Sequence, residues 1–300
     1  MYGHGCTYRL APHSCVIIIY IGYSVATRGA HYGIFYDCLR RRELCYNRPL
    51  EMRPLIQKLT PSRGFAHTFY FVYNALLPLL VFLLVRWTFI PLALSLILLS
   101  KWRMLAVRPR FWLANIRANA IDIVIGVSVL AFMTATTSEA LQLLWVVLWA
   151  GWLIGIKPKA DTLWVSLQAL IGFAAGMTAM FYTWNHAPLS VLVGSAGLLC
   201  FFAAHHFFDS FDEPYTRLLA FLWGYFGSAL TWILCHWLLF YGPVAQPTLL
   251  LVAIGFGLGT LYYLDHFDKL SLNIRRQVIF IMVAVLLVVL AFSDWGDKIV

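Results

Sequence analysis

The stretch KWRMLAVRPRFWLANIR, from Lys101 to Arg117, contains five basic residues and no acidic residue, and it lies between two long apolar runs. Basic residues resist transfer across a membrane during insertion, so a short loop of this kind stays on the cytoplasmic side. Pro109 interrupts any single long helix within the loop. The stretch therefore predicts the cytoplasmic anchor of a protein that crosses the membrane several times. The residues expected to contact the headgroups of anionic inner-leaflet lipids are Lys101, Arg103, Arg108 and Arg110.

The composition agrees with this interpretation. The 300 residues are 61% apolar and only 12% charged, which is too little polar surface to coat a single soluble core. The net charge of +9 does not indicate nucleic-acid binding, because the basic residues lie between apolar runs rather than on one basic face. We therefore predict an all-α integral membrane protein, a multi-pass helical bundle of the plasma or inner membrane with the lipid bilayer as its partner.

The apolar runs from residue 64 onward indicate about nine transmembrane helices joined by short loops, because a helix needs roughly 20 residues to cross a bilayer. The expected spans are 66–85, 88–104, 118–137, 141–156, 162–183, 188–207, 218–241, 248–264 and 277–293. The first two are separated only by Arg86 and Trp87, and each contains a proline. They form either two spans or one span and a re-entrant half-helix, so the count ranges from eight to ten.

The distribution of basic residues supports the count of nine. With the N-terminus in the cytoplasm, 14 Lys and Arg residues after residue 51 lie in cytoplasmic segments, and only Arg86 and Lys298 lie outside. This asymmetry is typical of a correctly oriented multi-pass protein. Because all the loops are short, any site must lie within the bundle or at its cytoplasmic rim.

Residues 1–51 differ from the rest of the chain and hold four of the six cysteines. We interpret them as a gene-model extension ahead of a start at Met52, or as a disordered or peripheral tail. A signal peptide ending at Ala26 is a third reading, but it would place the basic cluster 40–42 outside, against the charge rule. Residues 52–300 are expected to form a single transmembrane domain. The spacing of the cysteines indicates neither a zinc site nor a disulfide framework.

Asp122 and His236 lie well inside predicted spans and are candidates for function. Asp122 lies well within the third span, on one helical face with Asn115 and Asn119. A carboxylate at membrane depth costs about 2.5 to 3.5 kcal/mol at the centre of a span and often marks a functional site, although pairing with Arg117 or a neighbouring helix would also explain it. His236 lies in the seventh span, where an interhelical hydrogen bond is the simplest role.

Two cytoplasmic turns, HHFFDSFDEPYTR from His205 to Arg217 and DHFDKLSLNIRR from Asp265 to Arg276, resemble each other. Each contains a His and a Phe-Asp pair. If the turns meet in space, their nitrogen and oxygen atoms would suit a divalent metal. The alternative is that these residues keep the turns solvated and form local ion pairs. The candidate metal ligands are His205, His206, Asp209, Asp265 and His266.

Small residues spaced four apart predict close helix packing, because glycine lets two backbones approach each other in lipid. The pairs are Gly151 and Gly155, Gly172 and Gly176, and Gly255 and Gly259, with Gly194 and Gly197 nearby in the sixth span. We interpret these pairs mainly as packing within one chain. A homo-oligomer that uses the same faces is the alternative.

The sequence does not specify a reaction or a transported solute, and no catalytic residue is identified. HExxH, P-loop and GxSxG motifs do not occur. Architecture favours a permease-like transporter of a small solute or ion over an enzyme, with Asp122 and His236 as polar points and the 205–213 turn as a cytoplasmic mouth. The alternatives are a metal-dependent enzyme acting on a lipid-borne substrate at the inner leaflet, and a non-catalytic subunit or sensor. Helices interrupted within the membrane would favour transport.

Overall fold

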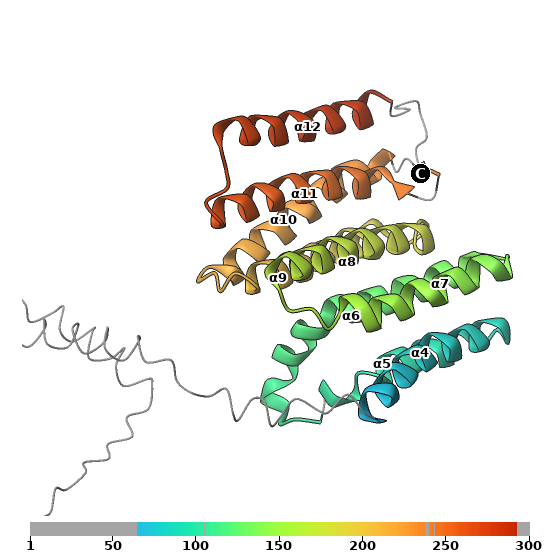
Figure 1. Ribbon diagram of the computed structural model, residues 1–300. Coiled ribbons are helices and arrows are strands. Elements are labelled where there is room, and N and C mark those ends of the chain that lie inside the picture. Colours follow the sequence, from blue (N-terminus) through green and yellow to red (C-terminus); the bar gives the residue numbers. More distant parts are fainter. Residues whose placement is uncertain (1–64, 105, 238–239, 243, 293–300) are drawn as a thin grey trace, which may run out of the picture. The chain divides into compact units, whose positions relative to one another are not determined.

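The computed structural model describes residues 65–104, 106–237, 240–242 and 244–292, apart from the side chains of 65–70, 103 and 237. These residues belong to one unit of the chain, Gly64–Val300, so the expected boundary between residues 51 and 52 lies outside them. The α-helices are α4 (Phe65–Arg86), α5 (Ile90–Leu99), α6 (Trp112–Ala135), α7 (Glu139–Gly151), α8 (Thr162–Thr183), α9 (Leu189–Asp209), α10 (Thr216–Leu234), α11 (Gln246–His266) and α12 (Leu272–Ala291) (Figure 1). The shorter elements are the 3₁₀ turns η1 (Trp102–Met104), η2 (Pro109–Phe111) and η4 (Cys235–Trp237), the π-helix η3 (Trp152–Ile156), and the strands β1 (Phe240–Tyr241) and β2 (Val244–Ala245).

Seven helical segments among the described residues are long and apolar enough to cross a membrane. They are Pro109–Ala135, Glu139–Ile156, Thr162–Thr183, Leu189–Asp209, Thr216–Leu234, Gln246–His266 and Leu272–Ala291. The prediction of an all-α protein is therefore confirmed, and the apolar helices are consistent with an integral membrane protein. Ahead of these segments, α4 has 22 residues and α5 has 10.

The helix bounds match the expected spans closely in the middle of the chain and less well at four places. Helices α6 and α12 begin at residues 112 and 272 instead of 118 and 277. Helix α8 covers the expected 162–183. Helix α5 is shorter than the expected 88–104 because the backbone turns at residues 100–101 and enters η1. Helix α10 stops at Leu234 instead of 241, because η4 follows and Phe240–Tyr241 pair with Val244–Ala245 in a short antiparallel hairpin. Gly242, with φ of +62°, supplies the left-handed conformation that such a tight turn requires.

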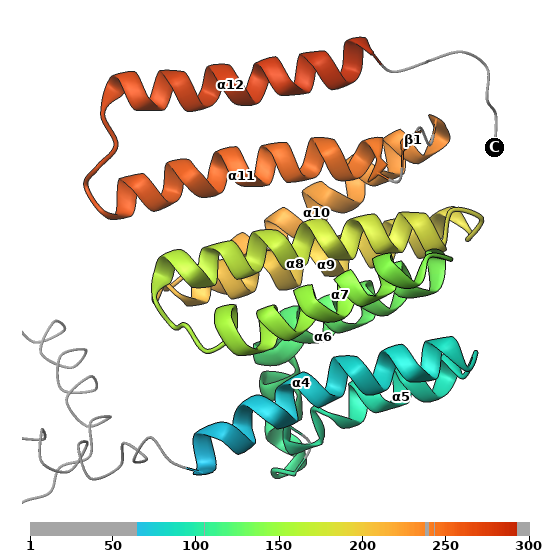
Figure 2. The same cartoon turned by 45° about the vertical axis from the view of Figure 1, so that its right-hand side comes forward.

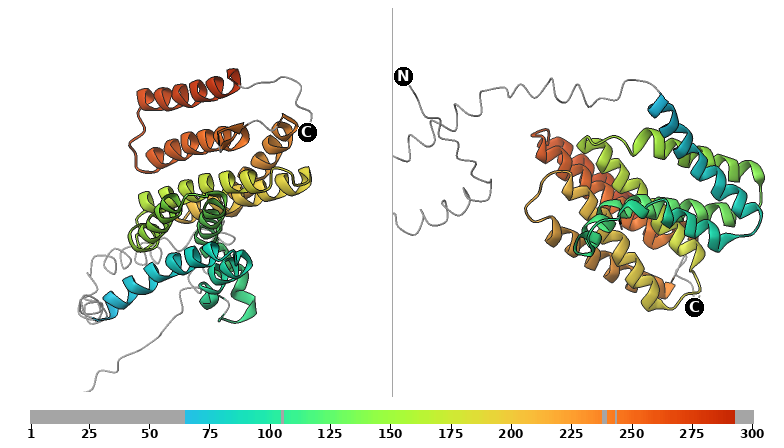
Figure 3. Two further views of the ribbon diagram at one scale, coloured as in Figure 1. Left: turned by 90° about the vertical axis from the view of Figure 1, so that its right-hand side faces the viewer. Right: turned by 90° about the horizontal axis from the view of Figure 1, so that it is seen from below.

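The helices pack on one another in an order that follows the sequence only in part (Figures 1 and 2). Helices α4 and α5 pack against each other, and both contact α6, while α4 also contacts α7. Helix α6 packs on α8, α8 on α9 and α11, and α9 most extensively on α10. Helix α12 packs on α11, as both views in Figure 3 also show.

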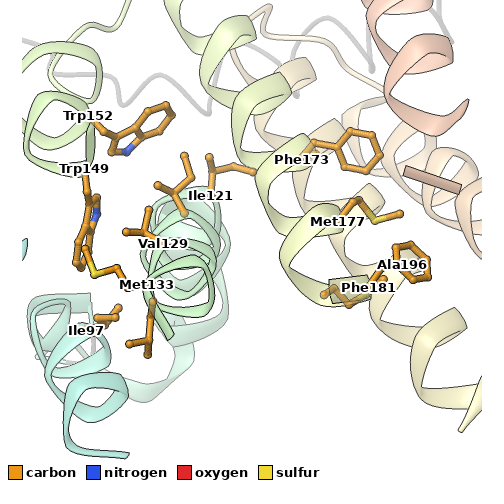
Figure 4. Packing of buried hydrophobic residues seen from close by; sticks show 14 of the residues in the cluster. Ile97, Ile121, Val129, Met133, Trp149, Trp152, Phe173, Met177, Phe181 and Ala196 are labelled. Atoms are coloured by element: carbon orange, nitrogen blue, oxygen red, sulfur yellow. The ribbon is translucent and has the colours of Figure 1, made fainter. Parts of the chain in front are cut away.

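The apolar core runs through the middle of this arrangement. Ile97 of α5, Met133 of α6 and Trp149 of α7 meet on one side of α6 (Figure 4). Phe173, Met177 and Phe181 of α8 and Ala196 of α9 fill the space on the other side. Helix α6 therefore lies between the α4–α5–α7 group and the α8–α9–α10 group, and side chains on opposite faces of α6 reach different neighbours.

Glycines bring α8 close to α6. A Cβ at Gly172 would lie 2.7 Å from Ile121 Cγ2, and one at Gly176 would lie 2.6 Å from Val124 Cγ1. At Gly257 a Cβ would lie 2.5 Å from Met282 Sδ of α12. The packing role predicted for Gly172 and Gly176 is thus confirmed within the chain.

Three of the predicted glycines have no such neighbour. Gly151, Gly155 and Gly194 face open space within the chain. Association of two copies through these faces stays a prediction.

The two similar turns adopt the same local backbone at the ends of α9 and α11. Asp212 and Asp268 both have positive φ, at 52° and 54°. The amide of Asp212 donates to the carbonyl of Asp209 at 3.4 Å, and the amide of Asp268 donates to the carbonyl of Asp265 at 3.0 Å. Aspartate tolerates the left-handed region better than most residues. The resemblance between the turns therefore reflects a shared way of ending a helix.

Candidate functional site: a buried lysine–aspartate cluster and its polar approach

Asp122 lies in the middle of α6, ten residues after its first residue Trp112 and thirteen before its last, Ala135. At about 1.5 Å per residue, the carboxylate is roughly 15 Å from one end of the helix and roughly 20 Å from the other. Its side chain is only 13% exposed. The flanking residues Ile121 and Ile125 are buried in the apolar core. A carboxylate in such surroundings requires charged or hydrogen-bonding partners.

Two lysines from different parts of the chain supply those partners. Lys101, which follows α5, places its Nζ 3.1 Å from Asp122 Oδ2. Lys157, which follows η3, places its Nζ 2.6 Å from the same oxygen. The Lys101 side chain is 14% exposed and that of Lys157 is 33% exposed. We call Lys101, Asp122 and Lys157 the lysine–aspartate cluster.

The second oxygen of the carboxylate is also occupied. The indole Nε1 of Trp152 donates to Asp122 Oδ1 at 3.3 Å. Trp152 opens the π-helix η3, and the wider turn of η3 ends directly before Lys157. π-Helical turns within α-helices occur frequently at functional sites. The irregular end of the α7–η3 segment thus delivers both a neutral donor and a charged donor to one carboxylate.

Gln168 of α8 holds the turn that carries Lys157. Its Nε2 donates to the carbonyls of Ile156 at 2.8 Å and of Lys159 at 3.2 Å. Gln168 is 7% exposed, so these bonds satisfy an amide that would otherwise be costly to bury. On the other side of the turn, Lys159 Nζ lies 3.3 Å from the ring centroid of Trp164, a cation–π contact.

The same glutamine links the cluster to α9. His206 Nε2 lies 3.4 Å from Gln168 Oε1, within hydrogen-bonding distance. The preceding residue of α9, His205, also has a polar partner, because its Nε2 lies 3.3 Å from Arg117 Nη1 of α6. Polar side chains therefore extend from Lys157 through Gln168 to the end of α9.

A polar pocket of about 680 Å³ lies at this end of α9. Its lining residues come from α6, from the end of α9, and from the turn that leads into α10: Ala114, Arg117, Ala118, His205, His206, Asp209, Glu213, Pro214, Tyr215, Thr216, Arg217 and Leu218. Two arginines, two histidines and two acids thus share one cavity. The pocket can accept a charged or strongly polar molecule.

The wall that α6 contributes to the pocket leads toward the cluster. Ala114, Ala118 and Asp122 are spaced four residues apart, so they lie on one face of α6. The two alanines line the pocket and Asp122 lies one turn beyond them. The cluster therefore lies one helical turn from the wall of the polar pocket.

A second cavity, an apolar groove of about 670 Å³, lies among α8, α9, α10 and α11. Phe173, Phe207, Trp223 and Tyr262 are among its lining residues. The hydroxyl of Tyr262 donates to Glu213 Oε2 at 2.6 Å, and Glu213 lines the polar pocket. One hydrogen bond therefore connects the walls of the two cavities.

The structure gives the intramembrane candidates different surroundings. Asp122 is buried as expected, but it pairs with Lys101 and Lys157, while Arg117 contacts His205 instead. His236 lies in η4, beyond the end of α10, and is exposed. Its Nδ1 lies 2.8 Å from the carbonyl of Trp232. His236 is therefore separate from the lysine–aspartate cluster.

The residues expected at lipid headgroups also divide into two groups. Arg108 and Arg110 are exposed, and the Arg110 guanidinium lies 4.6 Å from the centroid of the Phe111 ring. Lys101 instead points into the interior, toward Asp122. The side chain of Arg103 is not among those that the structure describes. Contact of these residues with anionic lipid stays a prediction.

The five candidate metal ligands are distributed over the ends of two helices. His205, His206 and Asp209 line the polar pocket, whereas Asp265 and His266 belong to the last turn of α11. The turns do meet, because the His266 ring lies 4.9 Å from that of Phe211. Among the described residues, however, no three His, Cys, Asp or Glu side chains are grouped in a way that could hold a metal ion. Metal binding stays an untested prediction.

Sequence reasoning missed three members of this region: Lys157, Gln168 and Trp152. Lys157 counted only as one of the 14 basic residues assigned to cytoplasmic segments, and Trp152 was assigned no role in a site. Gln168 did carry a signal, because a glutamine within the apolar run 162–183 needs a hydrogen-bonding partner in lipid.

No protein-family model, curated protein or solved structure matches this chain. Its description therefore comes from its own residues: a bundle of apolar helices, consistent with an integral membrane protein, that encloses a lysine–aspartate cluster.

Proposed function

We propose that the protein is a permease-like transporter that moves a small solute or ion across the membrane through the lysine–aspartate cluster. One observation carries the proposal: the mostly buried carboxylate of Asp122, in the middle of α6, is bound by one lysine that follows the short helix α5 and by another that follows the π-helical end of the α7–η3 segment. Charged groups inside spans are expensive and usually mark the path of a substrate or ion. Interrupted helices next to such a group are typical of transporters.

The interruption after α5 supports the same proposal. With 10 residues, α5 is about 15 Å long and covers about half of a hydrocarbon layer of roughly 30 Å. Lys101 lies level with Asp122, and three residues later the carbonyl of Met104 accepts a hydrogen bond from Asn115 Nδ2 at 3.2 Å. The segment between α5 and α6 therefore runs beside the first turns of α6. Non-helical backbone at membrane depth is tolerated where protein buries it or a polar cavity adjoins it.

The transporter would have nine spans and a cytoplasmic N-terminus: α4, α5 with the segment that follows it, and the seven longer segments. Arg86 at the end of α4 forms an ion pair with Glu139 at the start of α7, so these two ends lie together. The lysine–aspartate cluster and the basic loop lie toward the opposite ends of α5 and α7, which is the side that the charge distribution makes cytoplasmic. The polar pocket would then be the cytoplasmic mouth.

The orientation can be tested separately from transport. In full-length chains whose six cysteines are replaced by serine, single cysteines would replace Glu139 or Asp161, which are both exposed and lie at opposite ends of the α7–η3 segment. A membrane-impermeant maleimide added to intact cells should label position 139 at once and position 161 only after permeabilisation. Labelling in the reverse order would overturn the proposed orientation.

Transport itself is tested with the full chain reconstituted in liposomes. We would measure the flux of protons, Na⁺, K⁺, chloride and phosphate, and compare the native chain with the variant Lys101→Met, Asp122→Leu, Lys157→Met. The matched control is Lys269→Met, which removes one exposed lysine far from the cluster in sequence. At least one flux should exceed that of protein-free liposomes, fall to that background in the triple variant, and persist in the control. No flux above background, or an unchanged triple variant, would overturn the proposal.

A second candidate, an enzyme acting on a lipid-borne substrate, is favoured by the hydrogen bond that joins the apolar groove to the polar pocket. An acyl chain in the groove would place its headgroup near Glu213. A photoactivatable phospholipid with its diazirine on the acyl chain should then label α8 or α11 around the groove. Labelling spread evenly over all lipid-facing helices would remove this candidate.

A further inference from the structure

We infer that the transported solute is a small anion, and that Lys101 and Lys157 recognise it; this inference rests on the transport function proposed above. The charges of the cluster are the first observation. Two ammonium groups share one oxygen of one carboxylate, at 3.1 and 2.6 Å, so the three side chains together carry a net charge of +1 at neutral pH. Trp152 donates its indole N–H to the carboxylate, and Gln168 holds the turn that carries Lys157.

The geometry of the carboxylate disfavours a cation as the solute. Both oxygens of Asp122 already accept from donors, because Oδ2 contacts the two lysines and Oδ1 accepts from Trp152. A metal cation at Oδ2 would have to displace an ammonium group, and one at Oδ1 would still lie close to the two positive charges. Like charges in a poorly solvated site repel each other strongly.

An anion, in contrast, is attracted by the two lysines. It can approach the two ammonium groups and share them with Asp122, which reduces the repulsion between the lysines. Asp122 then acts as a built-in competitor: it holds the lysines in place when the site is empty and lowers the affinity for the anion. A carrier needs this balance, because a solute that binds too tightly is not released.

The approach to the cluster suits an anion of small size. Arg117 and Arg217 both line the polar pocket, as do Ala114 and Ala118, which lie two turns and one turn before Asp122 on α6. Of the two acids in the pocket, Glu213 is engaged by the Tyr262 hydroxyl. At the cluster, buried Ile121 and Ile125 close the apolar side of Asp122 and limit the room. Basic groups placed along a path of this kind attract anions toward the site.

Binding of chemically simple anions to the full-length chain in detergent tests the inference. The probes are radiolabelled chloride, acetate and inorganic phosphate, each measured by equilibrium dialysis. At least one should bind the native chain, and its affinity should fall about tenfold or more in Lys101→Met. In Asp122→Asn the affinity should rise about tenfold, because the competing carboxylate is removed while the shape is kept. Arg110→Met, which removes an exposed charge outside the cluster, is the matched control and should bind as the native chain does.

A double variant keeps the test decisive if Asp122→Asn does not fold. Lys101→Met with Asp122→Asn leaves the three positions with the native net charge of +1, now on Lys157 alone, and should still bind the anion. Binding that disappears in Asp122→Asn and in the double variant while both remain folded would overturn the inference. So would the absence of binding of all three probes to the native chain.

The flux and dialysis experiments distinguish a failure of the anion inference from a failure of the proposed transport function. If the liposomes show a flux of protons, Na⁺ or K⁺ that needs the cluster, and the detergent-solubilised chain binds none of the three anions, transport stands and the anion inference falls. If no flux of any tested ion needs the cluster, the transport proposal itself falls, whatever the dialysis shows.

Discussion

Lys157 Nζ lies 2.6 Å from Asp122 Oδ2, although 35 residues separate the two in the sequence, from 122 to 157. Lys101 approaches the same oxygen from 21 residues before it, from 101 to 122. The carboxylate therefore ties together the ends of α5 and η3 against the middle of α6. These contacts have consequences for stability that do not depend on any transported solute.

Replacing Asp122 by alanine should destabilise the protein by about 3 to 5 kcal/mol, because it leaves two poorly solvated ammonium groups beside each other without a counter-charge. Thermal unfolding of the purified chain in mild detergent measures the loss. The variant Lys101→Met, Asp122→Leu, Lys157→Met has no charge left in the cluster and should recover most of it. If Asp122→Ala is as stable as the native chain, the cluster contributes nothing to holding the helices together.

Substituting alanine for Gly172 should cost about 1 to 3 kcal/mol, because its Cβ would lie 2.7 Å from Ile121 Cγ2, and a β-branched side chain has little freedom to move away. The comparison is Gly194→Ala, which meets no atom within 4 Å and should be neutral or stabilising by up to about 1 kcal/mol. Denaturant unfolding in detergent measures both. Equal effects at the two positions would contradict close packing of α8 on α6.

The substitution Gln168→Leu should destabilise the protein by about 1 to 3 kcal/mol, since the carbonyls of Ile156 and Lys159 lose the amide donor that both of them share. Ser166→Ala is the control, because the Ser166 hydroxyl donates only within its own helix, to the carbonyl of Thr162 at 2.8 Å. Thermal unfolding should show a shift for Gln168→Leu alone. Equal shifts in both variants would argue against a role of Gln168 in holding the Lys157 turn.

The positive φ of Asp268 predicts different effects on stability for glycine and for valine at this position. Asp268→Gly should leave stability unchanged or raise it slightly, whereas Asp268→Val should lower it by about 1 to 2 kcal/mol, since φ is 54° and a β-branched residue is strained there. The same two substitutions at Lys269, which is not among the described residues with positive φ, provide the control. A valine variant of Asp268 as stable as the glycine variant would contradict the assigned turn.

Much of the fold was predictable because apolar run length and basic charge are local properties of the sequence. Helix α8 occupies the expected range, and Asp122 stood out as the acid placed furthest into a span. The ends of α5 and α10 were not predictable from hydropathy. Residues 235–241 remain apolar enough to continue a helix, and it is the hairpin at Gly242 that ends it; at residues 100–101 the backbone turns although Trp102 and Met104 follow.

The site was predictable only in part because a helical repeat gives the face of a residue but not its partner. The pattern placed Asp122 well inside a span, yet the nearest basic residue in the sequence, Arg117, contacts His205 on α9. Lys101 belongs to a loop whose five basic residues were expected to stay on the cytoplasmic side, and nothing in that loop distinguishes the lysine that points inward. Lys157 is likewise indistinguishable from Lys159 in sequence, although one contacts Asp122 and the other lies over Trp164.

Helix α12 has no buried residue, packs on α11, and is also held where Tyr241 donates its hydroxyl hydrogen to the carbonyl of Val289 at 2.9 Å. Most of its surface is therefore left for lipid, whose chains solvate it as well as another apolar helix would. The affinity of α12 for the bundle rests on a narrow strip that includes Gly257 and Met282. A change in bilayer thickness or lipid composition should consequently alter the packing of α12 first and the cluster around Asp122 last.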